Sequence, residues 1–276
     1  MTDPTTGTLP ASPPAVGALL RQWRSHRRRS QMDLALDAGV STRHLSFIET
    51  GRASPSPEVV LALADGLDVP LRERNTLLLA AGYAPRYDET PLDAPAMARA
   101  KAAVQRVLDA HDPYPGVVLD RRWDVVAANA GALALIEGVA PELVSPTLNV
   151  FRVSLHPDGL AARTRNFEEW GSYLVWQLEH QLALSGDAGL AALLEEVRGY
   201  PNVAALPTRM PDEDPMLVLT VDLVDPDLSL FTTLTTFGTP RDITLDELVI
   251  ELFYPADDAT AQHLGRAATT HGVERN

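Results

Sequence analysis

Residues 31–51 constrain what this chain can fold into more than any other stretch of it. Their first part has apolar residues at helical spacing and predicts a short helix from Gln31 to Ala38. Gly39 follows, and glycine adopts the left-handed backbone of a tight turn without a steric penalty. Ser41 is a favourable N-cap for a second helix, which is expected to end near Gly51. The stretch therefore predicts two short helices joined by a tight turn.

Three more helices are predicted around this pair. Apolar side chains recur on one helical face from Val16 to Arg28. Ser56 and Pro57 are typical of the N-cap and first position of another helix, and Pro70 opens the last one. We therefore expect an all-α N-terminal domain of five short helices over residues 16–82.

Charge is divided unevenly along the sequence. The formal net charge of the whole chain is −14, which by itself disfavours binding to nucleic acid. Residues 10–54, however, contain seven arginines against three acidic side chains, a local net charge of +4. From Tyr83 onward, 14 basic residues face 29 acidic ones, a local net charge of −15. Phosphates attract the first part and repel the second, so DNA contact is expected only near the N-terminus.

The helix pair also carries a specific sequence pattern. SQMDLALDAGVSTRHLSFIETG fits Q-x-x-L-A-x-x-A-G-V-S-x-x-x-L-S-x-I-E-x-G, and with this pattern residues 16–82 resemble the Xre/Cro-type helix-turn-helix family. The resemblance implies a transcriptional regulator that reads double-stranded DNA with the second helix of the pair. Asp33 and Asp37 depart from the basic or polar residues that the family usually has in the first helix.

The second helix divides into anchoring and reading positions. Leu45 and Ile48 are expected to face the core, which leaves the N-terminal half of the helix for base edges. Arg43 suits a bidentate contact with guanine, whereas Gln31 and Arg52 suit phosphate contacts. A helical bundle with a solvated arginine-rich face is the alternative. The residues expected to bind DNA are Gln31, Ser41, Thr42, Arg43, His44, Ser46 and Arg52.

A second domain is expected after a polar, proline-containing linker at residues 83–95. Residues 96–109 have helical periodicity, and Gly116–Ala128 has the pattern of a β-hairpin. Asn129 can cap the short helix that follows. Longer helices are expected over residues 166–184 and 187–198.

The C-terminal third of the chain changes to β-rich sequence. MLVLTVDLV, LSLFTTLTTF and ELVIELFYP are rich in β-branched and aromatic residues, and DPD and TPRD turns separate them. They predict three antiparallel strands, so the domain over residues 96–256 is expected to be α+β with an antiparallel sheet. Residues 1–15 are expected to form a disordered tail and residues 257–276 a C-terminal tail.

Two segments of the second domain carry a further resemblance. DPYPGVVLDRRWDVVAANAGALAL resembles the start of a PAS-like sensor domain. NVFRVSLHPDGLAARTRNFEEW is similar to the middle region of regulators with an MmyB-like ligand-binding domain, and the resemblance covers roughly residues 97–255. It implies that the domain binds a lipophilic small molecule such as a fatty acid. The acidic, proline-rich stretch at residues 207–215 departs from the common form of the family.

Ligand-binding candidates follow from this resemblance and from charge chemistry. A buried carboxylate needs a cation or hydrogen-bond donors, and Arg152 and His156 lie four residues apart, where they can share a helical face. An ion pair away from the ligand is an equally good role for Arg152, a cap or turn is the alternative for His156, and the core is the alternative for Trp170. The candidate ligand-binding residues are Asn129, Arg152, His156, Asn166 and Trp170.

The sequence shows no sign of catalysis, metal binding or membrane insertion. It contains no cysteine, which excludes disulfides and thiolate metal sites. Its seven histidines lack metal-ligand spacing, and nucleotide-binding, zinc-protease and serine-hydrolase motifs are absent. No apolar run approaches the roughly 20 residues that span a bilayer, and the N-terminus is not typical of a secretory signal. We expect a cytoplasmic protein that is not an enzyme and has no catalytic residue, metal or cofactor.

Three functions compete on this sequence. The first is a ligand-regulated transcription factor that binds a palindromic operator as a homodimer. The second is a DNA-binding protein whose C-terminal domain is a protein-interaction module, as in an antitoxin or a scaffold, without a small-molecule ligand. The third, an enzyme fused to a DNA-binding domain, has no supporting motif.

Overall fold

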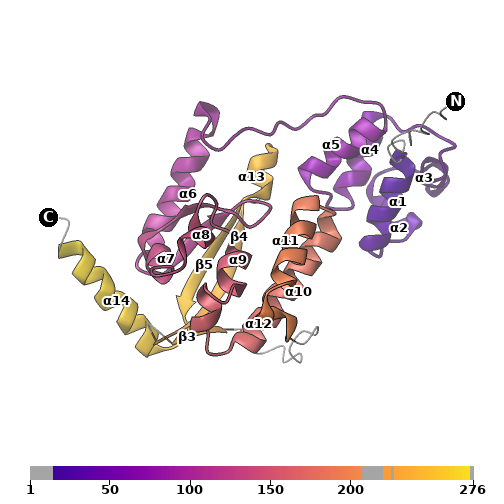
Figure 1. Ribbon diagram of the computed structural model, residues 1–276. Coiled ribbons are helices and arrows are strands. Elements are labelled where there is room, and N and C mark those ends of the chain that lie inside the picture. The colour runs from indigo at the N-terminus through magenta and orange to yellow at the C-terminus, as the bar shows by residue number, and fades with distance from the viewer. Residues whose placement is uncertain (1–14, 207–219, 225–226, 274–276) are drawn as a thin grey trace, which may run out of the picture. The chain divides into compact units, whose positions relative to one another are not determined.

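The chain forms two compact units in the computed structural model, which describes residues 15–206, 220–224 and 227–273 (Figure 1). The first, here called the N-terminal unit, contains the chain up to Thr90 and also residues 239–246. The second, here called the sheet unit, contains residues 91–238 and the chain from Glu247 onward. The N-terminal unit is therefore built from two stretches that lie far apart in the sequence.

The described residues of the N-terminal unit before Thr90 form five α-helices, as the sequence predicts. Serine side chains cap three of them: the hydroxyls of Ser30, Ser41 and Ser56 accept hydrogen bonds from backbone N–H groups three residues further on. Pro57 stands at the first position of its helix, where no N–H is needed. The helices are α1 (Val16–His26), α2 (Gln31–Asp37), α3 (Thr42–Glu49), α4 (Pro57–Asp65) and α5 (Leu71–Ala80).

Close packing fixes where α3 lies. Leu45 and Ile48 are buried in one core with leucines of α1, α2 and α4. Gly17 brings α1 against the end of α3, because a β-carbon there would lie 2.1 Å from the carbonyl oxygen of Ile48. Gly39 has a φ of +66° and makes the turn between α2 and α3. One side of α3 is thus held by the core and the other side is left at the surface.

A five-stranded antiparallel sheet organises the sheet unit, with strand order β2-β1-β5-β4-β3. The hairpin and the three C-terminal strands expected from the sequence are all present. The predicted stretch MLVLTVDLV lies partly outside the described residues, and its described part is β3. The strands are β1 (Gly116–Leu119), β2 (Val125–Ala128), β3 (Thr220–Val224), β4 (Asp227–Thr236) and β5 (Val249–Pro255).

Helices pack on both faces of this sheet. On one face, Gly116 leaves room for Leu108 of α6 (Ala98–His111) to meet Leu252 of β5. On the other face, Val117 and Leu119 share a core with helices α7, α9, α10 and α11. These helices are α7 (Ala130–Leu135), α9 (Val150–Leu155), α10 (Phe167–Ser185) and α11 (Ala188–Arg198). The second face, here called the inner face, holds the larger core and the pocket described below.

Periodicity missed the shorter elements. Those not expected are η1 (Pro95–Met97), α8 (Pro141–Val144), η2 (Leu160–Arg163), α12 (Pro201–Ala204) and α13 (Ile243–Glu247). Residues 257–276, expected as a tail, include helix α14 (Asp258–Val273). Every helix in the described residues is too short or too polar to cross a membrane.

Candidate functional site

A hydrogen-bonded acid ties together the three helices around the turn. Glu49, at the end of α3, is 8% exposed and receives hydrogen bonds from Arg24 of α1 at 2.6 and 2.9 Å. Gln31, the first residue of α2, donates its side-chain amide to the same carboxylate at 2.7 Å. Burial favours a higher pKa for Glu49, but the hydrogen bonds from Arg24 and Gln31 outweigh it and hold the pKa below its ordinary value.

This network gives Gln31 a structural partner. The amide nitrogen expected near a phosphate is bound to Glu49, while the backbone of Gln31 still lies in the first turn of α2. Ser41 is likewise the N-cap of α3, and its hydroxyl accepts from the backbone N–H of His44 at 3.1 Å. Both side chains therefore position the helix pair, whatever further contacts they make.

The outward side of α3 carries the reading positions expected from the sequence. Thr42 and Arg43 are exposed, and His44 and Ser46 are partly exposed. The guanidinium carbon of Arg43 lies 5.3 Å from the centre of the Phe47 ring, one helical turn further on. The guanidinium of Arg43 therefore lies over this ring, and it forms no ion pair within the described residues.

Charges next to α2 and α3 leave a positive balance at this surface. Asp37, one of the two acids on α2, forms an ion pair with Arg29, and the other, Asp33, accepts a hydrogen bond from the Ser30 hydroxyl at 2.7 Å. Arg28 and Arg52 are exposed and form no ion pair with the described residues. The two acids are therefore engaged locally, while cations flanking α3 stay available.

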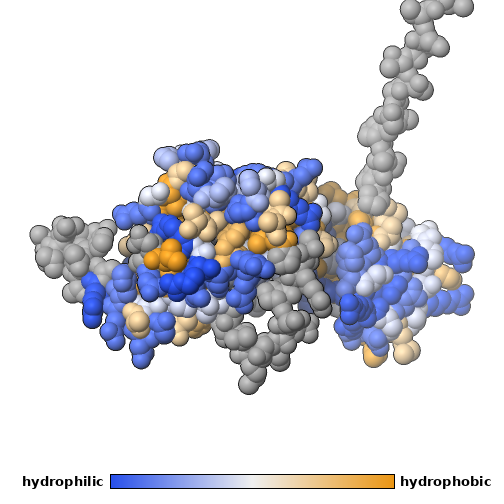
Figure 2. Space-filling view, turned by 60° about the horizontal axis from the view of Figure 1, so that its bottom comes forward, coloured by the Kyte–Doolittle hydropathy of each residue, from blue (hydrophilic) through white to orange (hydrophobic). Residues whose placement is uncertain are grey.

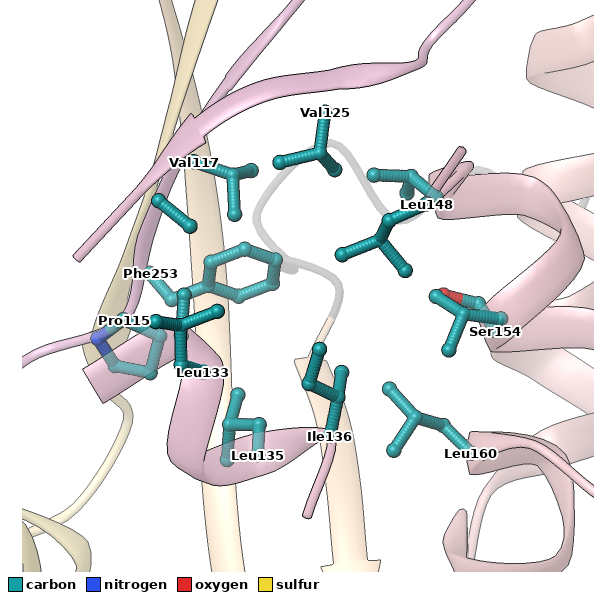
Figure 3. Close-up of a pocket in the computed structure, with 14 residues that line it drawn as sticks. Pro115, Val117, Val125, Leu133, Leu135, Ile136, Leu148, Ser154, Leu160 and Phe253 are labelled. Atoms are coloured by element: carbon teal, nitrogen blue, oxygen red, sulfur yellow. The ribbon is translucent and has the colours of Figure 1, made fainter. Parts of the chain in front are cut away.

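A pocket opens on the inner face of the sheet unit, between β1, β2, β5 and the helices α7 and α9 (Figure 3). The empty space at this pocket is about 510 Å³, a figure that includes open solvent at its mouth. Among the described residues, only Ser154 supplies a side-chain polar group to the lining, and none of the lining residues is charged. The lining residues are Pro115, Val117, Val125, Ala128, Ala132, Leu133, Leu135, Ile136, Leu148, Val150, Val153, Ser154, Leu160 and Phe253.

The mouth of the pocket is apolar as well. Leu133, on α7, lines the pocket and is 52% exposed to solvent. The face of the molecule in Figure 2 is mostly hydrophilic, with apolar residues gathered in a few patches. An exposed leucine at the rim of an apolar cavity favours entry of a lipophilic molecule.

Two of the candidate ligand residues use their side-chain amides to hydrogen-bond backbone groups. Asn129 caps α7: its amide oxygen accepts from the N–H groups of Gly116 and Ala132, and its nitrogen donates to Tyr114 and Leu108. The amide oxygen of Asn166 accepts from the backbone N–H of Asp222, and its nitrogen donates to Thr220. Neither lines the pocket.

The other three candidates also lie outside the pocket lining. Arg152 donates two hydrogen bonds to Glu196 of α11, at 2.7 and 2.8 Å. Helix α9 ends at Leu155, so the helical face expected for Arg152 and His156 is not formed; His156 is extended and packs edge-on against Tyr200. Trp170 is 5% exposed and belongs to the core.

A buried acid that was not among the predicted site residues lies near the pocket. Glu251 of β5 is 5% exposed, and among the described residues its side chain accepts one hydrogen bond, from the hydroxyl of Thr232 on β4 at 2.9 Å. Burial raises its pKa to about 7. The alternation in ELVIELFYP places Glu251 on the same face as Val249 and Phe253, which was the available signal.

Residues 239–246, here called the arm, connect β4 to β5 but pack in the N-terminal unit. The carboxylate of Asp246 caps α5 by accepting from the backbone N–H of Leu71 at 2.8 Å. Asp242 accepts from the N–H of Thr90, and the N–H of Ile243 donates to the carbonyl of Asp88 at 2.8 Å. The segment expected as a local turn is therefore a structural part of the N-terminal unit.

Two family models match the chain. Residues 100–267 match the MmyB-like transcription regulator ligand binding domain, and residues 15–77 match a helix-turn-helix domain. The first match covers the sheet and its pocket, and the second covers α1–α5 up to Leu77. The described residues contain no group of acidic or histidine side chains arranged to hold a metal ion.

Curated relatives match a short part of the chain. The chain is 39% identical over 67 residues to the uncharacterized HTH-type transcriptional regulators Mb0023 of Mycobacterium bovis and Rv0023 of Mycobacterium tuberculosis, a match to 24% of this chain and 26% of each relative. It thus matches about a quarter of the length of these curated relatives.

A solved structure also matches a part of the chain. The restriction-modification controller protein C.AhdI from Aeromonas hydrophila is 32% identical, with 21% of this chain and 89% of that chain covered and a TM-score of 0.21. The decisive match is that of the ligand-binding domain, which extends over more than half of the chain. With a helix-turn-helix domain before this ligand-binding domain, the chain belongs to the MmyB-like transcription regulators.

Proposed function

We propose that this regulator binds a palindromic operator as a homodimer, and that a lipophilic small molecule in the apolar pocket changes its affinity for that operator. The outward side of α3 carries the DNA part of the proposal: Arg43 is exposed there, while Leu45 and Ile48 hold the helix to the core. The apolar lining carries the ligand part. Binding to the operator implies work in the cytoplasm.

The lining favours a ligand with an alkyl or similarly apolar body. A fatty acid is one such molecule, and its chain suits walls made of valine, leucine and isoleucine. Its carboxylate meets no cation in the lining, because Arg152 is bound to Glu196 outside it. We therefore expect the chain of such a ligand, rather than its charge, to supply most of the binding.

The arm supports regulation of DNA binding by the ligand. Phe253 lines the pocket from β5, and the residues just before that strand belong to the N-terminal unit. A ligand that displaces Phe253 acts on a strand whose beginning is attached to α5 through Asp246. We propose β5 and the arm as the route from pocket to DNA-binding helices.

Replacing Arg43 by alanine tests the DNA part. An operator is first selected from a random duplex library with the full-length protein. We expect Arg43→Ala to weaken operator binding by about 1–3 kcal/mol and to relax base preference at one position of each half-site. Arg52→Ala should instead weaken binding to all DNA sequences by a similar factor. It should also reduce the slope of log affinity against log salt concentration by about one.

Arg106→Ala, which changes an exposed arginine of α6, is the control and should leave operator binding unchanged. Unaltered affinity and unaltered base preference in Arg43→Ala would show that Arg43 does not read bases.

Filling the pocket tests the ligand part. Mass spectrometry of small molecules extracted from the purified protein should find a lipophilic compound. Ala132→Trp should lose it, because Ala132 lines the pocket and a tryptophan occupies the ligand's space. Ala134→Trp, at an exposed site on the same helix, is the matched control. Equal retention of the compound by both variants would place its site elsewhere.

A further inference from the structure

One carboxyl oxygen of Glu251 lacks a hydrogen-bond partner within the described residues. This oxygen is buried, whereas the other accepts from the Thr232 hydroxyl. A buried polar atom without a hydrogen-bond partner lowers the stability of the fold, and such atoms are uncommon in folded proteins. No ion pair to Glu251 is formed by the described residues, so a neighbouring cation does not supply the missing partner.

Strand register places this carboxyl next to the pocket. Glu251 lies directly opposite Val117 of β1, and residues opposite each other in an antiparallel pair share a face with β-carbons about 5 Å apart. Phe253 follows two residues later on that face. Val117 and Phe253 both line the pocket, so Glu251 stands beside its sheet wall.

Strands β4 and β1 and helix α10 each place a side chain near Glu251. Thr232 and Leu234 of β4 lie on the same face of the sheet as Glu251. From α10, Tyr173 is the titratable group that interacts electrostatically with Glu251, and the carboxyl together with burial raises the pKa of that phenol. From β1 the neighbour is apolar Val117. The carboxyl is thus flanked by neutral side chains in a site suited to a neutral ligand group.

We propose that Glu251 is the polar anchor of the ligand site and binds a hydroxyl group at the end of an otherwise apolar ligand that fills the pocket. The proposal rests on ligand binding in that pocket and specifies its chemistry. A hydroxyl both donates and accepts, so it pairs with the carboxyl in either protonation state. A carboxylate accepts only, and it is therefore repelled once Glu251 is ionised.

The protonation of Glu251 makes this preference depend on pH. Burial raises its pKa to about 7, so the carboxyl is protonated at pH 6 and ionised at pH 8.5. At pH 6 it can donate to a ligand carboxylate, whereas at pH 8.5 two negative charges oppose each other. The affinity for decanol, which is uncharged at both pH values, should not change between pH 6 and pH 8.5.

The test measures binding of 1-decanol and of decanoate to the full-length, lipid-stripped protein at pH 6 and pH 8.5. We expect decanol to bind equally at both pH values within twofold, and decanoate to bind at least tenfold more weakly than decanol at pH 8.5. The gap should narrow to threefold or less at pH 6. A gap that is the same at both pH values would overturn the proposal.

Two variants identify the group responsible. Glu251→Gln, which keeps a donor and an acceptor, should retain decanol affinity and lose the pH dependence of decanoate binding. Glu251→Leu should lose at least tenfold in decanol affinity. The control Glu142→Gln, at an exposed acid of α8, should behave as the unaltered protein. Circular dichroism checks that each variant is folded. If Glu251→Leu does not fold, the result for Glu251→Gln decides the outcome.

Failure of the anchor and failure of the pocket give different results. If Glu251→Gln keeps the pH dependence while Ala132→Trp abolishes binding, the pocket binds ligands but Glu251 is not the anchor. If neither compound binds the unaltered protein, or Ala132→Trp binds both as well as the unaltered protein does, the pocket itself is refuted as the site and the anchor with it.

Discussion

Two buried acids give this protein opposite responses to pH. Glu49 is surrounded by hydrogen-bond donors, and its pKa lies below the ordinary value despite burial. Glu251 has one hydroxyl partner in an apolar setting, and its pKa rises to about 7. The shifts are opposite because the hydrogen bonds from Arg24 and Gln31 outweigh burial at Glu49, whereas the Thr232 hydroxyl does not outweigh burial at Glu251.

Glu49→Gln should destabilise the N-terminal unit. Removing the charge leaves Arg24 without its partner and should lower the free energy of unfolding by about 3 kcal/mol at pH 7. A lowered pKa stabilises the fold above the unfolded-state pKa, and this stabilisation is lost as pH falls through the folded-state pKa. Urea unfolding between pH 7 and pH 3 should show that loss in the unaltered protein and a smaller one in Glu49→Gln. Parallel pH profiles would contradict the role assigned to Glu49.

Glu251→Gln should show the reverse trend. The folded state holds the proton of Glu251 more tightly than the unfolded state, so stability falls as pH rises from about 4.5 to about 7 and then levels off. The glutamine variant does not ionise. In urea unfolding at pH 8 it should therefore exceed the unaltered protein by up to roughly 3 kcal/mol, with the difference vanishing near pH 4.5. A variant that is less stable at pH 8 would mean that ionised Glu251 is well solvated.

At the level of elements, α1 and α3 are locked by a contact that only glycine permits. A β-carbon on Gly17 would lie 2.1 Å from the Ile48 carbonyl oxygen, and this oxygen is backbone and cannot rotate away. Gly17→Ala should therefore push α3 outward and cost about 1–3 kcal/mol in unfolding free energy. Gly265→Ala, in α14 with open space around it, should be neutral or stabilising. Both are read from thermal melts, and equal melting temperatures would show that α1 and α3 adjust freely.

Local sequence signals predicted the elements that depend on local chemistry. Serine caps, the Gly39 turn and the alternation of ELVIELFYP each act within a few residues, so they located α2, α3 and β5. The pairing of Arg152 with Glu196 joins residues 44 apart in sequence and depends on how α9 packs against α11. No periodicity encodes such a partner, and the ligand-site prediction centred on Arg152 therefore chose residues outside the pocket.

The contacts of the arm are likewise not predictable from local sequence patterns. TPRD has the composition of a local turn, and residues 239–242 do connect two adjacent strands. Its carboxylates, however, bind backbone groups about 150 to 175 residues earlier in the chain. Asp242 and Asp246 are ordinary turn and helix residues by sequence, and only the folded chain brings α5 to them.

At the scale of the whole molecule, the route proposed through the arm can be tested by removing the two carboxylates that attach the arm. We expect the double variant Asp242→Ala, Asp246→Ala to bind both operator and ligand, while the operator affinities with and without ligand become equal. The carboxylates that attach the arm to Thr90 and Leu71 are then missing. Fluorescence anisotropy of a labelled operator measures this, with Asp158→Ala at an exposed loop as the control. Undiminished coupling in the double variant would refute this route.

The arm also affects the order in which this protein is completed during synthesis. The helices that face DNA lie within the first 90 residues, yet their unit includes residues up to Asp246. A ribosome must therefore translate most of the chain before the cap of α5 is available. A chain that stops earlier leaves the N–H of Leu71 without this carboxylate, so the helix-turn-helix unit is completed only in a protein that has also made most of its ligand-binding domain.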